Sequence, residues 1–247
     1  MIYNMLVPFC KVRNLGSFFN NKSGEPTPRV KFLMDLLNTL DIYYELDEFT
    51  ANGISGYNLI LPGKSKAVVA HHDIVNPNID NANDNSASII NAIAIKLHRP
   101  DVTVALLDGE EVGGVGSSRF SNQINSGKYG PIDWVLNLEL TGIGGNTFFI
   151  GYYPGKLYDS ILKNFNCPVY HPPFNDSIVF RHNNIDSCVI TTLPILEKGK
   201  SSIVWKDSYL AENLLTHCHS SKDTLDSINL DDMRKFVKDV ALPIIDF

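Results

Sequence analysis

Apolar residues along the chain occur either in short continuous runs or at helical spacing. These two patterns alternate, which predicts strands that alternate with helices. Short apolar runs of strand length occupy residues 66–75, 102–107 and 132–140. Between the first two, residues 86–97 place apolar side chains at helical spacing, on a stripe made of Ile89, Ile90, Ile93, Ala94 and Leu97. Buried strands that alternate with amphipathic helices are typical of α/β proteins whose central strands run parallel.

The segments on either side extend this pattern. Thr27 and Pro28 suit the cap and first turn of a helix, and apolar residues then recur at helical spacing as far as Leu40. Residues 43–50 and 57–63 show the alternation of strands, which predicts a hairpin near an edge of the sheet. Further strands are predicted at 147–150 and 186–191, and further helices at 117–124, 155–165, 176–182 and after Asn229.

Together these elements predict an α/β fold with three layers, α/β/α, in which helices cover both faces of a mixed, centrally parallel sheet. The 247 residues contain no internal repeat, low-complexity tract or convincing linker. A chain of this length can form a single α/β domain with a substantial core. We therefore expect residues 1–247 to form one domain.

Composition narrows the class of protein without identifying a function. The chain is 44% hydrophobic and 19% charged, as in globular proteins, and its net charge of −6 argues against a nucleic-acid partner. No apolar run approaches the roughly 20 residues of a membrane span. The four cysteines lack CxxC spacing, and residues 1–14 lack the features of a signal peptide. These observations predict a cytoplasmic location and no membrane association.

Two adjacent acids, Glu110 and Glu111, follow the predicted strand 102–107. In open α/β sheets, the carboxyl ends of the strands are where ligands bind. Neighbouring carboxylates repel one another unless a cation or a shared proton holds them, and a divalent metal ion would do this. For this segment alone, the simpler interpretation is an exposed helix start, where the helix dipole favours acidic residues.

Other candidate ligands lie at the ends of predicted elements. His71 and Asp73 close the strand 66–75, and a metal-binding imidazole commonly donates its second N–H to a carboxylate. Asp84 lies at the entry of the helix 86–97, where it could instead serve as an N-cap. Each residue is therefore open to a structural and a metal-binding interpretation.

Glu139 and His219 complete the candidate set. Glu139 stands near the end of an otherwise apolar strand, and a buried carboxylate needs a partner. The collected candidates are two imidazoles and three carboxylates: His71, Asp84, Glu111, Glu139 and His219. Such a set suits zinc, and five ligands fit two ions if one carboxylate bridges them. The sequence lacks the nucleophile elbow, the P-loop and the dinucleotide fingerprint of competing catalytic sites.

Several segments resemble motifs of one enzyme family. AHHD (70–73) resembles A-H-x-D, NANDNSAS (81–88) resembles G-A-D-D-N-A-S-G, and DGEEVGGVGSSRF (108–120) resembles G-x-E-E-x-G-x-x-G-S. LNLEL (136–140) is similar to I-N-L-D-M, NDSIVFRHNNIDSCVI (175–190) to S-D-H-x-x-F-x-x-x-G-I-P, and CHSSKDT (218–224) to Y-H-T-P-x-D-T. The family is that of zinc-dependent aminopeptidases with co-catalytic dinuclear sites, which includes aminopeptidase Y-like enzymes, glutamate carboxypeptidase II and the divergent glutaminyl cyclases. The resemblance covers about residues 66–230.

The resemblance implies a dinuclear zinc exopeptidase, most simply an aminopeptidase acting on small peptides. It assigns two zinc ions per chain to the five candidate ligands: His71 and Glu139 for one ion, Glu111 and His219 for the other, and Asp84 for both. It also implies that Asp73 orients His71. Glu110 would be the general base and acid, which takes a proton from the attacking water and passes it to the leaving amine.

The sequence departs from the family pattern at two positions. Asn83 replaces the first Asp of the bridging motif, which should leave Asp84 in place as a ligand. Glu139 stands where this family usually has Asp, whereas related deacylases and carboxypeptidases often have Glu. Carboxyl-terminal specificity therefore stays open, although the 80 residues from Glu139 to His219 leave little room for the dimerisation domain of those relatives.

Two other functions compete with the peptidase. One is glutaminyl cyclase-like acyl transfer with a single zinc ion, because LLDGEEV resembles that branch as closely. The other is a non-catalytic domain on the same fold, which the presence of all five candidate ligands and Glu110 disfavours. Specificity is expected to depend on residues 197–217, where Trp205 and Tyr209 could line an apolar pocket.

Overall fold

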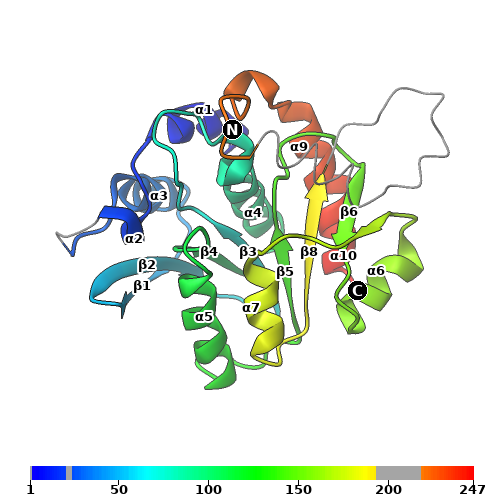
Figure 1. The fold of residues 1–247 in the computed structure, drawn as a ribbon. Coiled ribbons are helices and arrows are strands. Elements are labelled where there is room, and N and C mark those ends of the chain that lie inside the picture. The colour runs from blue at the N-terminus through cyan, green and yellow to red at the C-terminus, as the bar shows by residue number, and fades with distance from the viewer. Residues whose placement is uncertain (1, 21–23, 193–217) are drawn as a thin grey trace.

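The computed structural model describes residues 2–20, 24–192 and 218–247, and within them an eight-stranded mixed sheet lies between helices (Figure 1). The order across the sheet is β1-β2-β4-β3-β5-β8-β6-β7. The strands are Glu45–Ala51 (β1), Ile54–Leu61 (β2), Lys66–His71 (β3), Thr103–Leu107 (β4), Trp134–Leu138 (β5), Phe148–Gly151 (β6), Val169–Tyr170 (β7) and Ser187–Thr192 (β8). The central strands β3, β4, β5 and β8 run parallel, which confirms the predicted fold class.

The outer strands make the sheet mixed. β1 and β2 form the predicted antiparallel hairpin at one edge, and β2 continues antiparallel along β4. At the other edge, β6 runs antiparallel to β8 and parallel to the two-residue strand β7. Because β3, β4 and β5 are adjacent and parallel, the loops after them meet at one edge of the sheet.

Helices cover both faces of the sheet (Figure 1). The α-helices are Leu6–Cys10 (α1), Ser17–Asn20 (α2), Pro28–Thr39 (α3), Ala87–His98 (α4), Val115–Asn125 (α5), Lys156–Asn164 (α6), Asp176–His182 (α7), Leu230–Phe236 (α9) and Leu242–Ile245 (α10). Short 3₁₀ turns occupy Ile2–Met5 (η1) and Leu225–Ser227 (η3), and π-helical turns occupy Ala82–Ser86 (η2) and Val237–Ala241 (η4). α5 and α7 pack on one face, and α3, α4, α9 and α10 on the other.

Alternation along the strands divides the core into these two layers. In β3, Ala67 and Val69 pack with Phe120 of α5 and Phe180 of α7. Val68 and Ala70 point to the opposite face, into the larger cluster that includes α3 and α4. A strand with both faces buried needs apolar side chains at every position, which explains the unbroken apolar run in the sequence.

The N-terminal segment adds a part of the core that the spacing did not predict. η1 and α1 bury Leu6, Phe9 and Cys10 against the same cluster as α3 and α4. A run this short carries too few helical turns to show periodicity, so its structure depends on packing. α3 begins as predicted, because the Thr27 side chain accepts a hydrogen bond from the amide of Val30 at 3.4 Å.

No helix within the described ranges combines the length and the apolar character needed to cross a bilayer.

Candidate active site

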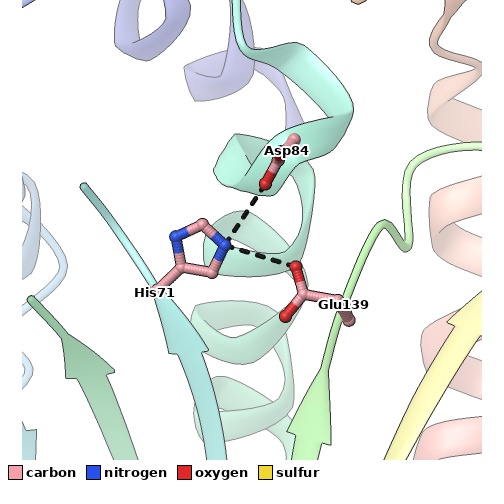
Figure 2. Close-up of side chains that lie close together, drawn as sticks. All are labelled: His71, Asp84 and Glu139. Carbon is pink, nitrogen blue, oxygen red and sulfur yellow. Dashed lines mark hydrogen bonds and ion pairs between the residues drawn. The ribbon is translucent and has the colours of Figure 1, made fainter. Parts of the chain in front are cut away.

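Three of the candidate ligands meet above the ends of β3 and β5. His71 is the last residue of β3, Glu139 directly follows β5, and Asp84 lies in η2. The Nε2 atom of His71 is 3.2 Å from Asp84 Oδ1 and 3.2 Å from Glu139 Oε1. Figure 2 shows the imidazole pointing between the two carboxylates.

The remaining two candidates form a second group beside the first. His219 Nε2 lies 3.1 Å from Asp84 Oδ2 and 3.0 Å from the carboxylate of Glu111. Glu111 follows β4, whereas His219 comes from the turn that begins the last described range. Asp84 thus directs one oxygen to His71 and the other to His219, so the structure brings all five predicted ligands together around it.

The donor set fits metal ions better than hydrogen bonds alone. A neutral imidazole has at most one N–H at Nε2, yet two carboxylate oxygens face that atom in each half of the cluster. In each of two groups, His71 with Asp84 and Glu139 and His219 with Asp84 and Glu111, the ligand atoms lie within 4.8 Å of one another. Ligands at about 2.0 Å around a tetrahedral zinc ion are separated by about 3.3 Å, close to the separations found here.

Asp73 contacts both His71 and the backbone of the two glutamates. Its carboxylate lies 3.4 Å from Nδ1 of His71, on the side of the ring away from Asp84. The same carboxylate accepts hydrogen bonds from the amides of Glu110 and Glu111 at 3.2 and 3.1 Å. It therefore fixes the turn that carries both glutamates and lies beside the His71 ring, and its role in orienting that ring stays a prediction.

Glu110 lies beside the ligand cluster but outside the two groups around Asp84. Its side chain is 8% exposed and can approach His71 together with Glu111. Burial raises the pKa of the Glu110 carboxyl well above its ordinary value, and Glu139, Asp176 and Asp73 add to the increase against the opposing charge of His71. A carboxyl group with a raised pKa beside a ligand cluster is suited to proton transfer.

The imidazoles and acids of the cluster shift one another's pKa values in opposite directions. Burial disfavours the Asp84 carboxylate, yet His219 and His71 outweigh burial and lower its pKa. Hydrogen bonds to Asp84 and Glu111 raise the pKa of His219 to about 10. Without a metal ion, the site therefore retains protons on its imidazoles, which a metal ion would displace.

The turn that presents Asp84 depends on three polar neighbours, two of them not predicted. Asp223 accepts hydrogen bonds from the amides of Asn83 and Asp84 at 2.7 and 3.1 Å. The Asn85 side chain donates to Leu138 O at 3.0 Å, which ties η2 to the end of β5. Asn83 accepts from Gly142 N at 2.8 Å, so an amide oxygen suffices where the family motif has Asp. The sequence signal for Asp223 is its place in CHSSKDT, at the Asp of the family motif Y-H-T-P-x-D-T.

Asp176 is a second acid that sequence reasoning missed. It is the first residue of α7, fully buried, and neither carboxyl oxygen has a hydrogen-bond partner within the described residues. Burial raises its pKa to about 7, with further increases from Glu139 and Asp73 and an opposing effect of His71. Asp176 stands at the Asp of the similar segment S-D-H-x-x-F, but acids are ordinary in the first turn of a helix, so the sequence assigns it no role.

These arrangements match one family of known proteins. The model of peptidase family M28 matches residues 59–243, three quarters of the chain. The chain belongs to peptidase family M28. This confirms the resemblance carried by the sequence motifs, and with the fold it supports a metal-dependent peptidase, that is, a hydrolase.

Solved structures of several enzymes share the fold of this M28 chain. The LapA aminopeptidase of Legionella pneumophila superposes with a TM-score of 0.70 at 14% identity, over 98% of this chain and 69% of that one. The glutaminyl cyclase of Fimbriiglobus ruber gives 0.71 at 16% identity, over 99% and 93% of the two chains. The zinc aminopeptidase BSAP of Bacillus subtilis gives 0.59 at 17% identity, over 78% of this chain and half of its own. Comparison with curated proteins finds no match.

The segment expected to influence specificity lies outside the described residues. It includes Trp205 and Tyr209 and the lysines at positions 198, 200 and 206. Arg181 is a cation within the described residues that could in principle face a substrate carboxylate, but it pairs with Asp186 at 3.0 Å and donates to Pro154 O. Arg181 closes α7 at the end far from Asp176, so it does not face the ligand cluster.

Proposed function

We propose that this M28 protein is an aminopeptidase that hydrolyses small peptides at a pair of zinc ions. The main observation behind the proposal is that the two oxygens of the Asp84 carboxylate face two different imidazoles. Each imidazole also faces a second carboxylate, Glu139 or Glu111. This is the arrangement expected when one carboxylate bridges two ions.

The residues divide the work between holding the ions and moving a proton. His71 and Glu139 would hold one zinc ion, Glu111 and His219 the other, and Asp84 both. Bound zinc lowers the pKa of a coordinated water to about 7 and polarises a carbonyl group. Asp73 holds the His71 ring and the amides of both glutamates, so the ligands keep their places when a peptide binds.

Glu110 would act as the general base and then the general acid. Its raised pKa lets it accept a proton from the attacking water and return that proton to the amine that leaves. Its backbone amide is fixed by Asp73, so the carboxyl group works from a constant position. One residue thus serves both halves of the hydrolysis.

The charge of the site favours a peptide with a free amino terminus. The acids of the cluster pair with His71 and His219, and no lysine or arginine pairs with them within the described part of the chain. Glu139 Oε2 and both oxygens of Asp176 are buried acceptors without donors there. Two bound zinc ions would offset the charge of the three ligand carboxylates, so the attraction for an ammonium group, with its up to three N–H donors, would come from acids outside the ligand set such as Asp176.

Acyl transfer from an N-terminal glutamine is the second candidate. The glutaminyl cyclase of Fimbriiglobus ruber matches this chain in extent, since 93% of that chain is covered. A single zinc ion would suffice for that reaction. Five converging ligands favour the peptidase, because a one-ion site has no use for all of them.

The zinc-loaded protein should be tested on aminoacyl amides, dipeptides and N-glutaminyl peptides. We expect hydrolysis of unblocked substrates and its loss when the amino terminus is acetylated, because acetylation removes the charge the site attracts. Activity that survives acetylation but is lost on amidation of the carboxyl terminus would establish a carboxypeptidase instead. Formation of pyroglutamyl products without hydrolysis would establish the cyclase.

A further inference from the structure

Arg29 is a buried cation that the proposed chemistry does not use. Its residue exposure is 1%, and it is among the largest fully buried side chains within the described ranges. Its guanidinium carbon lies 3.9 Å from the centre of the Phe9 ring. Burial lowers its pKa to about 10, which leaves the group charged at neutral pH. Burying a charged group is unfavourable unless its donors make hydrogen bonds. The hydrogen-bond partners of Arg29 therefore indicate its role.

The partners of Arg29 belong to three separate segments of the chain. Nε donates to the carbonyl of His72 at 2.8 Å, and Nη2 donates to the hydroxyl of Ser86 at 3.0 Å. Nη1 lies 3.2 Å from Val12 O and 3.5 Å from Phe9 O, beyond the end of α1. No carboxylate pairs with the guanidinium within the described residues, so its donors serve backbone and hydroxyl groups only.

Two of these segments carry proposed ligands. His72 stands between His71 and Asp73, and its own amide donates to Leu107 O at 2.8 Å. With its carbonyl bonded to Arg29, both polar groups of this peptide segment are fixed. Ser86 closes η2, two residues after Asp84. One rigid guanidinium therefore connects the end of β3 to the turn that presents Asp84.

Arg29 also lies outside the residues that match the M28 family model, which begin at residue 59. The connection between the end of β3 and η2 is thus made by a residue outside the part of the chain that the family model describes. A guanidinium has five donors in a fixed planar fork, so it holds several groups at defined angles, whereas the three donors of a lysine ammonium rotate on a flexible stem.

We propose that Arg29 is a positioning residue that holds His71 and Asp84 at the separation needed to bind a metal ion. The inference rests on the proposed metal site but not on the choice of substrate. A purely structural role would lower stability without a specific effect on metal affinity. The two roles are distinguished by comparison with another buried cation.

Lys96 is a matched control within the same fold. Its ammonium group donates to the carbonyls of Pro62, Pro100 and Val102 at 2.6–2.9 Å and its residue exposure is 8%. It lies at the last turn of α4, near the beginning of β4 and away from the ligand-bearing ends of the strands. Lys96→Met should therefore destabilise the fold and leave the metal site intact.

The experiment measures zinc transfer from the zinc-loaded protein to a chelator of known affinity, together with thermal unfolding. Arg29→Met should weaken zinc binding at least about tenfold relative to wild type, the lower end of the loss typical for residues that orient metal ligands. Lys96→Met should lower the unfolding temperature but retain wild-type zinc affinity. Excess zinc should restore peptidase activity to Arg29→Met with an unchanged KM.

The outcomes separate the two proposals. Wild-type zinc affinity in Arg29→Met, or an equal loss in Lys96→Met, would overturn the role of Arg29 while the metal site stands. If Arg29→Met does not fold, Ser86→Ala decides, because it removes only the bond to η2; it should weaken zinc binding severalfold, and unchanged affinity would overturn the proposal. A wild-type protein that binds no zinc would overturn the metal site itself.

Discussion

At the residue scale, Asp84 is the side chain that both halves of the ligand cluster share. Asp84→Ala should reduce zinc at both sites, because its oxygens face His71 and His219 separately. His219→Ala should empty mainly one site, since His71 and Glu139 keep their positions on β3 and β5. Elemental analysis after dialysis against trace zinc measures both variants. Equal zinc content in Asp84→Ala and His219→Ala would show that Asp84 does not bridge.

Glu110 and Glu111 are neighbours in sequence with different expected tasks. Glu110→Gln should retain zinc and lose activity by about 100- to 10,000-fold, the usual range for removal of a positioned acid-base group. Glu111→Gln should lose zinc as well, because the Glu111 carboxylate faces His219 at 3.0 Å. Zinc content and peptidase rate are measured on the same samples. Equal loss of metal in both variants would mean that the two roles are misassigned.

Sequence reasoning found the candidate ligands and the supporting residue Asp73, but assigned no role to the other residues that hold the ligands. His71, Asp84 and Glu139 lie at the ends of predicted strands and helices and within segments that resemble family motifs. Their positions along the sequence were therefore enough to identify them. The hydrogen bonds of Arg29 to His72 and Ser86 join residues 43 and 57 positions apart. A local sequence pattern cannot predict such contacts. The same holds for Asp223, which reaches Asn83 across 140 residues.

At the scale of elements, α7 begins with a carboxyl group whose burial opposes its ionisation. The pKa of Asp176 is about 7 in the folded chain against an ordinary value of 3.8. Between these values the folded state binds a proton that the unfolded state lacks, so stability falls as pH rises through this window. Asp176→Asn cannot ionise and should escape that loss.

The metal-free Asp176→Asn protein should therefore be more stable than metal-free wild type at pH 8, by on the order of a few kcal/mol. The difference should close as the pH falls below 3.8, where the wild-type carboxyl group becomes protonated in both states. Denaturant unfolding at a series of pH values measures it. A difference independent of pH would show that Asp176 ionises freely in the folded protein.

The sequence predicted the helices and strands that are long enough to show a repeated apolar pattern. It did not predict the elements of only a few residues, whose conformation depends on local packing. The apolar runs of β3, β4 and β5 follow directly from burial on two faces. The apolar stripe located α4 correctly, although its residues 87–96 are buried on every side and not on one face alone. α1 spans five residues and includes Pro8, so packing against η1 and η2 decides its conformation. β7 has two residues, fewer than any alternation needs.

At the scale of the whole molecule, the first 58 residues do more than extend the sheet. Gly16 packs so closely on Asp73 that an added Cβ would lie 2.5 Å from the Asp73 Cβ atom. Ser17 donates to Asp108, which also accepts from the amide of Tyr57 at 3.1 Å. These residues precede the segment matched by the M28 family model, yet they line the underside of the site. The N-terminal part therefore contacts residues that support the site.

Metal binding should be visible in the stability of the whole chain. Zinc ions that bind only the folded state raise the free energy of unfolding, by about 2.7 kcal/mol when free zinc is 100 times its dissociation constant. Removal of zinc with a chelator should accordingly lower the unfolding temperature, and readdition should restore it. An unfolding temperature that ignores zinc would argue against a site formed by folding.

The most direct test of a metal-dependent peptidase is hydrolysis of an unblocked aminoacyl amide before zinc removal, after chelation, and after titration with zinc. We predict that activity disappears with the metal and returns as zinc is added, reaching its full value at no more than two ions per chain. Calorimetry counts the ions while product release is followed on the same samples. Undiminished hydrolysis by protein shown to be free of metal would contradict the account.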